Sequence, residues 1–231
     1  MERTEVAGNL ADVRSRIEKA CARAGRDPAG VKLVGVTKTV SAQSIREGIE
    51  AGLEIIGENY IQEAKSKREP LAGFPVAWHC IGHVQTNKVK IAIECFDWIE
   101  TVDRQSLAVE LNRRAGDAGR KIPVLIQVNI GGEATKSGMG EEEIVSFLRL
   151  CRDFDHLEVR GLMAIPPFFD QPERVRPYFR RMGELLKTLK AEAPQPEKMR
   201  ELSMGMSGDF EAAIEEGATI VRVGTAIFGR R

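Results

Sequence analysis

Lys38 is the residue whose place in the sequence most directly suggests chemistry. It follows the apolar, β-rich segment VKLVGVT, residues 31–37, at the point where a loop begins. If that segment is a strand, its alternation of period two puts Lys38 on the same face as Val34 and Val36. Apolar neighbours partly desolvate an ammonium group and favour the neutral amine, which is the form that attacks a carbonyl. A lysine at a strand end can also keep its ammonium in water, so this segment alone leaves both interpretations open.

Arg222 is the second residue whose position requires a partner. In TIVRVG, residues 219–224, it alternates with Ile220 and Gly224 on one strand face. An arginine within a strand cannot lose its proton and must find an acceptor. A carboxylate from a neighbouring strand would satisfy it, and so would the neutral ring nitrogen of a ligand.

Two segments near the C-terminus combine hydroxyl groups with glycines. Hydroxyls donate hydrogen bonds, and glycines allow the backbone to approach a ligand closely, so both segments suit an anion such as phosphate. Each is also compatible with an ordinary turn, with Ser207 as a helix N-cap. The segments are LSMGMSGDF and VRVGTAIFG, and their candidate residues are Ser203, Ser207, Gly205, Gly208, Gly224 and Thr225.

Eight apolar or alternating segments predict the strands that must position these residues, and a helical segment follows each of the first seven. In a chain of 231 residues this order fits a single (β/α)8 barrel, which typically needs about 250 residues. We expect one domain over residues 1–231, with residues 1–25 as a helix packed on the barrel. An open doubly wound sheet is the alternative, but the sequence lacks its dinucleotide glycine fingerprint. The predicted strands are residues 31–37, 54–57, 76–82, 97–102, 124–130, 157–165, 200–205 and 219–224.

A barrel gathers its chemistry at the C-terminal ends of its strands, and frequently binds phosphate in the loops after the seventh and eighth. Lys38 ends the first predicted strand, Asn59 follows the second and His83 follows the third. The two hydroxyl-rich segments lie after the seventh and eighth. A lysine, a phosphate cradle and a fixed cation, Arg222, together describe a pocket for pyridoxal 5′-phosphate (PLP), with Lys38 as the Schiff-base amine.

Five segments, in this order along the chain, resemble the pyridoxal phosphate homeostasis protein family, known as YggS or PROSC. They are VGVTKTV, GENYIQEA, WHCIGHVQTNK, GLMAIPP and LSMGMSGDFEAAIEEGATIVRVGTAIFG. The resemblance implies a single barrel similar to the N-terminal domain of alanine racemase, which is the type III fold of PLP proteins. It also implies that PLP is held on the lysine matching Lys38.

Matching the family's motifs residue by residue implies the remaining cofactor contacts. Arg222 would face the pyridine nitrogen. The phosphate would lie among Ser203, Ser207, Gly224 and Thr225, and the ring pocket would include Asn59, His83 and Met204. The sequence departs from its relatives at Val40, where proline is common, and at Cys80, where a bulkier apolar residue is usual.

A carrier of the cofactor fits these residues better than an enzyme does. Racemisation needs an acid or base on each face of the substrate carbon. In alanine racemases a tyrosine from a separate β-domain serves the second face, and we expect no such domain in a chain that ends at Arg231. Tyr60 and Tyr178 both lie in predicted helical segments. We therefore expect a protein that binds, buffers or delivers PLP to apo-enzymes, with weak amino-acid racemase activity as the alternative.

Composition limits the partners. The chain has 34 basic and 34 acidic residues, so its net charge of zero favours neither nucleic acid nor an anionic membrane. The first residues, MERTEVAGNL, carry no apolar signal core, and no apolar run approaches the length of about 20 residues that a membrane span needs. Its four cysteines lack CxxC spacing and suit reduced, buried thiols. We expect a cytoplasmic monomer.

Two other motifs suggest different chemistry. NIGGEATKSGMG, residues 129–140, is similar to a nucleotide-binding P-loop, but Thr135 stands where that loop needs a glycine before its lysine, here Lys136. A metal site could combine His79, Cys80 and His83, although the two histidines share a side of a strand only if that strand continues through Gly82. We expect neither nucleotide nor metal.

Overall fold

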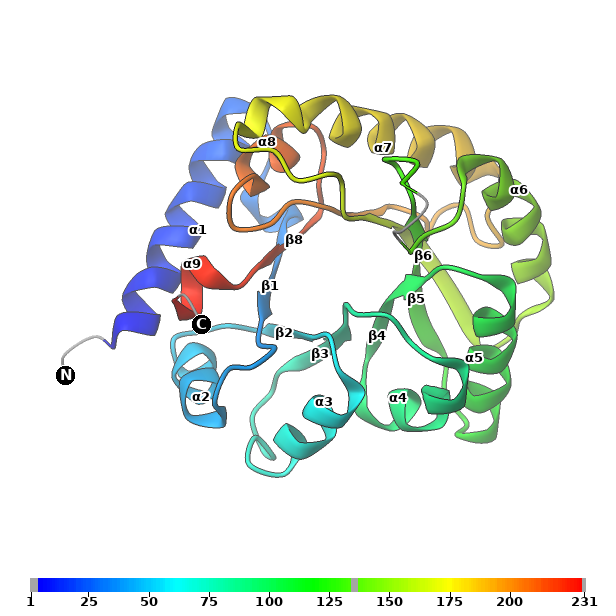
Figure 1. Ribbon diagram of the computed structural model, residues 1–231, viewed down its shortest axis with the longest axis horizontal. Helices are drawn as coiled ribbons and strands as arrows, with labels where there is room; N and C mark the ends of the chain where they lie inside the picture. The colour runs from blue at the N-terminus through cyan, green and yellow to red at the C-terminus, as the bar shows by residue number, and fades with distance from the viewer. Residues whose placement is uncertain (1–3, 134–136, 230–231) are drawn as a thin grey trace.

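The computed structural model describes residues 4–133 and 137–229. Its eight strands run parallel and close into a barrel in chain order, and the circle is completed by β8 (Ile220–Val223) pairing with β1 (Lys32–Val36). Figure 1 shows this ring of strands with the helices around its outside. The predicted (β/α)8 barrel is confirmed, and the open doubly wound sheet is wrong because the edge strands of such a sheet would not pair.

Each predicted strand overlaps the observed one, and most of the observed strands are shorter. The apolar runs continue past the last ladder hydrogen bond into the loops, which is why their C-terminal limits were set one or more residues too late in most cases. β2 instead extends one residue further, to Glu58. The other six strands are β2 (Ile55–Glu58), β3 (Ala77–Cys80), β4 (Trp98–Val102), β5 (Ile122–Val128), β6 (Leu157–Ala164) and β7 (Glu201–Ser203).

The helices form the outer layer. α1 (Glu5–Arg23) starts at Thr4, whose side chain accepts a hydrogen bond from the Ala7 N–H, and it buries Leu10, Val13 and Ile17 at helical spacing. Figure 1 shows α1 beside α8 and α9, and it packs against both. The other helices are α2 (Ala42–Glu50), α3 (Ile61–Arg68), α4 (Val89–Cys95), α5 (Gln105–Asp117), α6 (Glu141–Leu150), α7 (Arg176–Leu189), α8 (Phe210–Glu215) and α9 (Thr225–Phe228).

Two separate buried regions hold the barrel together. The larger lies between strands and helices and includes Phe96, Phe147 and Phe179. A smaller apolar cluster of Val34, Leu125, Met163 and Ile220 is separate from it, as expected for side chains inside the ring of strands. Fully burying one Val, Leu, Ile, Met or Phe side chain stabilises the fold by about 1.5–3 kcal/mol.

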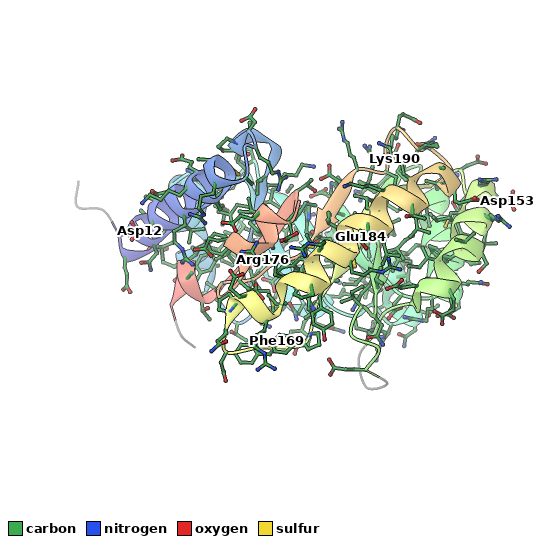
Figure 2. All side chains as sticks on the ribbon, turned by 90° about the horizontal axis from the view of Figure 1, so that it is seen from above. Asp12, Asp153, Phe169, Arg176, Glu184 and Lys190 are labelled. Atoms are coloured by element: carbon green, nitrogen blue, oxygen red, sulfur yellow. The ribbon has the colours of Figure 1, made fainter. Side chains whose placement is uncertain are left out.

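The barrel has two distinct rims. Figure 2 shows Phe169, which follows β6, at one rim and Lys190, which follows α7, at the opposite rim. The first is the rim at the C-terminal ends of the strands, where loops from every strand converge. None of the helices that the structure describes is long and apolar enough to span a membrane.

Candidate functional site

A cavity of about 400 Å³ opens at the C-terminal rim, among the loops that follow β1, β2, β3, β6, β7 and β8. Its volume lies within the range of about 300–1,000 Å³ that is usual for small-molecule sites. Apolar side chains, among them Val36, Ile81 and Phe168, form much of the wall. Six of the nine predicted site residues also line it: Lys38, Asn59, Ser207, Arg222, Gly224 and Thr225.

Lys38 lies in a turn at the edge of this cavity. β1 ends at Val36, so the buried face of the strand stops before the lysine, and Lys38 is exposed. Of the two interpretations of this segment, the structure agrees with a lysine at a strand end that reaches solvent, rather than one desolvated by apolar neighbours. Thr39, which follows it, has φ +59°, a left-handed conformation that β-branched residues rarely adopt. The turn leaves the Lys38 amine accessible to a ligand that enters from solvent.

Arg222 lies at the base of the cavity, and the structure identifies its acceptors. Its side chain is 4% exposed, and its guanidinium donates from Nη1 to Ser203 Oγ at 2.5 Å and from Nη2 to the Ala164 carbonyl at 2.8 Å. Ser203 Oγ in turn donates to Glu100 Oε2 at 2.6 Å. A carboxylate from another strand does support Arg222, but through a hydroxyl rather than by direct contact.

Glu100 connects this network to the far side of the barrel interior. Its Oε1 lies 2.6 Å from His79 Nδ1, and the His79 ring stacks on Trp98 with centroids 5.3 Å apart. Burial raises the pKa of Glu100, but the His79 hydrogen bond and the charges of His79 and Arg222 outweigh it and hold that pKa below its usual value. Burial lowers the pKa of Arg222, and the negative charges of Glu100 and Asp209 offset part of this lowering. The result is an ionised carboxylate that fixes the guanidinium in place.

Sequence reasoning missed Glu100 as part of the site. The available signal was an acidic residue in the middle of the apolar strand segment DWIETV. A buried acid in a strand requires a partner, just as Arg222 does. His79, considered above only as a metal ligand, is that partner.

Three predicted residues do not reach the cavity. Ser203 and Met204 are fully buried, because β7 ends at Ser203 and directs its hydroxyl to Glu100. This position corrects the expectation that the Ser203 hydroxyl belongs to the phosphate loop. His83 is exposed beside Asp103, with Nδ1 3.2 Å from Oδ2, and borders a neighbouring depression that shares Asn59 with the cavity.

The loops after β7 and β8 meet at Ser207. Its Oγ accepts hydrogen bonds from the N–H groups of Gly224 at 3.3 Å and Ala226 at 3.4 Å. A Cβ on Gly208 would meet nothing within 4 Å, so the backbone there faces open space. Hydroxyls and backbone N–H groups are the donors that a phosphate monoester takes, so this end of the cavity fits that group.

Asp209 brings a negative charge to the same loop. Its Oδ1 accepts the Met206 N–H at 2.6 Å, and burial raises the pKa of its carboxyl. The bond braces the loop between β7 and α8 rather than offering a donor to a ligand. The positive charges that line the cavity are those of Lys38 and Arg222.

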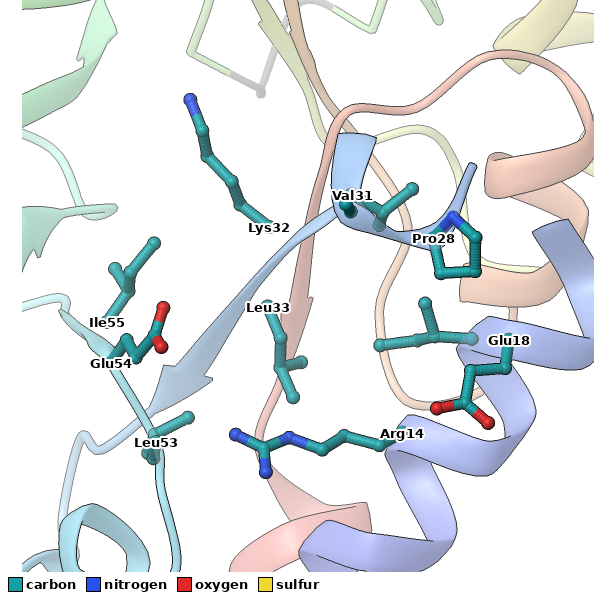
Figure 3. A pocket seen from close by; sticks show the side chains of 11 residues that line it. Arg14, Glu18, Pro28, Val31, Lys32, Leu33, Leu53, Glu54 and Ile55 are labelled. Atoms are coloured by element: carbon teal, nitrogen blue, oxygen red, sulfur yellow. The ribbon is translucent and has the colours of Figure 1, made fainter. Parts of the chain in front are cut away.

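A second cavity, of about 320 Å³, lies at the opposite rim, where β1 and β2 begin. Figure 3 shows Arg14 extending from α1 toward Leu33 and Leu53, with Glu18 on the same helix beside it. Arg14 donates to the Gly52 carbonyl at 2.5 Å, and Lys32 pairs with Glu201 at 2.6 Å. These cations are engaged by the protein itself, so this cavity lacks the donor set found around Lys38.

The P-loop-like motif falls partly on residues that the structure does not describe. Thr135 and Lys136 lie outside the described residues. His79 is bonded to Glu100 inside the barrel while His83 is exposed at the rim, so the proposed metal ligands diverge. Within residues 4–133 and 137–229, no group of three or more His, Cys, Asp or Glu side chains is arranged to hold a metal ion.

A glycine sets the position of Asn59. A Cβ added to Gly82 would lie 2.2 Å from the Asn59 carbonyl oxygen, so Gly82→Ala must displace Asn59 from the cavity wall. We expect a loss of about 1–3 kcal/mol in the free energy of unfolding, measured by urea denaturation. The control is Gly8→Ala in α1, where a Cβ meets nothing within 4 Å and should stabilise the helix by about 0.5–1 kcal/mol. Equal stability of Gly82→Ala and the wild type would contradict this close packing.

The fold of this chain is shared with a known class of barrel proteins. The sequence model described as "Alanine racemase, N-terminal domain" matches residues 8–231. Among solved structures, the alanine racemase of Clostridium difficile 630 matches with a TM-score of 0.73 at 14% identity, over 97% of this chain and 56% of that one. The barrel is therefore of the alanine racemase N-terminal type.

More similar relatives identify the family within that class. A pyridoxal phosphate homeostasis protein of Aquifex aeolicus is 46% identical over 222 residues, 96% of each chain. PipY of Synechococcus elongatus PCC7942, solved with PLP bound, has a TM-score of 0.86 at 36% identity, over 97% of this chain and 100% of that one. The chain belongs to the pyridoxal phosphate homeostasis protein family.

Proposed function

We propose that this protein binds PLP in the cavity at the C-terminal rim, attaches it to Lys38 and releases it to other proteins. The observation that carries the proposal is the convergence of Lys38, Arg222 and the Ser207 loop on one cavity. A phosphorylated aldehyde needs an amine for its aldehyde, donors for its phosphate and a partner for its ring nitrogen. PipY, which was solved with PLP bound, supports the same cofactor here.

The attachment is a reversible condensation. The Lys38 nitrogen, in its neutral form, attacks the aldehyde carbon, a C=N bond forms and one water molecule leaves with the aldehyde oxygen. An incoming amine reverses the attachment by adding to the same carbon, and Lys38 leaves as a free amine. When bound, PLP supplies an electrophilic carbon that captures primary amines.

Two other parts of the cavity orient the cofactor. Ser207, Thr225 and the backbone N–H groups of their loops hold the phosphate, and Arg222 faces the ring nitrogen. A guanidinium has only donors, so this nitrogen stays unprotonated and the ring is a weaker electron sink. That property suits holding the cofactor better than rearranging a substrate on it.

The tyrosines support a carrier rather than a racemase. Tyr60 is 60% exposed and lines the neighbouring depression, while Tyr178 stacks on Phe169 with centroids 5.9 Å apart. Neither lines the cavity over Lys38. Asp170 does line it, and this carboxylate is the reason to keep weak amino-acid racemase activity as the second candidate.

The proposal includes a monomer in the cytoplasm that exchanges PLP with apo-enzymes and free amino acids. Cys21, Cys80, Cys95 and Cys151 are unpaired and buried, as suits a reducing compartment. Burial raises the pKa of Cys80 and of Cys151 to about 12, so neither thiol is reactive at neutral pH.

A transfer assay separates the two candidates. PLP-loaded protein, freed of excess cofactor, is mixed with an apo-aminotransferase, and the recovery of aminotransferase activity is followed. A parallel sample with L-alanine is analysed for D-alanine. A carrier restores the aminotransferase and forms D-alanine no faster than free PLP does. Failure to restore activity together with sustained D-alanine formation would instead establish a racemase.

A further inference from the structure

A buried lysine lies beneath the turn that carries Lys38. Lys67 of α3 is 7% exposed, and its Nζ donates to the Thr37 carbonyl, Glu58 Oε1 and Glu63 Oε1, each at 2.7 Å. Glu58 is fully buried and also accepts the Thr37 hydroxyl at 2.7 Å. All three donors of the Lys67 ammonium are therefore used within the protein.

The same cluster reaches the far side of the turn. Glu63 Oε1, which binds Lys67, also accepts the Thr39 N–H at 2.5 Å. The residues on both sides of Lys38 are thus tied to one ion pair: Thr37 through its carbonyl and Thr39 through its N–H. Lys38, between them, is exposed and lines the cavity.

Thr39 explains why the turn needs this support. At φ +59° it is the only non-glycine residue in the described part of the chain with a positive φ. A threonine there is strained, and such strain persists only where surrounding contacts impose it. Two hydrogen bonds hold the turn: the Val40 N–H donates to the Thr37 carbonyl at 3.0 Å, and the Thr39 N–H donates to the carboxylate of Glu63, which also binds Lys67.

We propose that Glu63, held by Lys67, is a positioning residue that keeps the Lys38 turn in the conformation that captures PLP. The inference rests on the proposed function, because it assumes that Lys38 is the attachment site. Glu63 is better suited to a test than Lys67, because removing Lys67 would leave the buried carboxylate of Glu58 without its cation. Glu63 is partly exposed, and without it the contacts of Lys67 to Glu58 and Thr37 remain possible.

The test measures the rate at which PLP becomes attached to Lys38. Samples are mixed with PLP, reduced with borohydride at set times and analysed by mass spectrometry of the Lys38 peptide. We expect Glu63→Ala to slow attachment by about tenfold, while Glu63→Gln, which keeps an oxygen for the Thr39 N–H, stays within about twofold of the wild type. Glu47→Ala is the matched control: Glu47 is a half-buried glutamate of α2 that accepts a hydrogen bond from Gln43, and its removal should leave the rate unchanged.

A double variant distinguishes positioning from general stability. Glycine adopts φ +59° without strain, so Thr39→Gly should remove most of the effect of Glu63→Ala. Thermal unfolding without PLP, recorded for every variant, establishes that each one is folded. The inference is overturned if Glu63→Ala attaches PLP as fast as Glu47→Ala, or if its defect is undiminished in the Thr39→Gly background. Failure of the wild type to attach PLP at Lys38 would overturn the proposed function itself.

Discussion

Lys38→Ala is expected to abolish covalent attachment of PLP and to lower its retention through gel filtration on the order of 100-fold. The phosphate and ring contacts of Ser207, Thr225 and Arg222 remain in this variant, so weak, rapidly reversible binding should persist. The absorption band of the attached cofactor should disappear. Because Lys38 is exposed, its removal should change the free energy of unfolding by no more than about 0.5 kcal/mol.

Lys90→Ala, an exposed lysine of α4, is the control for nonspecific reaction of PLP with surface amines. It should retain the band and the cofactor at wild-type levels. If Lys38→Ala kept the absorption band while Lys90→Ala, or another surface change, lost it, Lys38 would not be the attachment site.

Glu100→Ala is expected to cause the largest loss of stability, about 3–5 kcal/mol. The substitution leaves the Ser203 hydroxyl, which accepts from Arg222, without its own acceptor, and leaves His79 without its hydrogen-bond partner. Denaturant unfolding measures the loss directly. PLP affinity should fall as well, because the Arg222 guanidinium is no longer fixed. A variant as stable as the wild type would show that Glu100 does not hold the network together.

Glu100→Gln separates the charge of Glu100 from its hydrogen bonds. The pKa of Glu100 in the folded protein lies below its usual value of 4.5, so this carboxylate stabilises the fold above that pH. Its contribution is lost as the pH falls through the lower pKa of the folded state. Burial raises the pKa of Glu58, so the effect of Glu58 on stability changes with pH in the opposite direction. Glu58 is present in both proteins and therefore does not alter the comparison. We therefore expect Glu100→Gln to lose less stability than the wild type between neutral pH and acid pH.

The barrel was predictable because its signals are local. Apolar runs of strand length alternate with helical segments eight times, and a parallel sheet of this kind closes with its loops at one rim. The convergence of Lys38, Asn59 and Arg222 on one cavity follows from that topology alone. Their positions at strand ends are sufficient, without knowledge of the side-chain contacts.

The missed features depend on details finer than the topology. Whether Lys38 is buried is decided by where β1 ends, and only Thr37 separates Lys38 from the end of that strand at Val36. Ser203 and Ser207 differ by four positions, which is enough to place one inside the barrel and the other in a loop. The contacts of Glu100 join side chains from different strands, and Lys67 of α3 reaches Glu58 and Thr37 from other elements, so these contacts could not be read from a local pattern. The Lys67–Glu63 pair, four residues apart on α3, is the local part of the cluster.

The polar network also explains how a cation is accommodated within a barrel. The interior beside Val34 and Ile220 is apolar, while Arg222, two residues further along β8, ends in hydrogen bonds to Ser203 and Ala164. Each buried polar group in this chain of contacts has a partner, as burial requires. The guanidinium is thereby fixed in position before any ligand enters.

The most direct test of the account is to identify the lysine that carries the cofactor. The protein is loaded with one equivalent of PLP, reduced with borohydride, digested and analysed by mass spectrometry. We predict one pyridoxyl-phosphate adduct, on the peptide that contains Lys38, and none above background on other lysines. Adducts spread over surface lysines, or concentrated on a residue outside this cavity, would contradict the site and the function proposed for it.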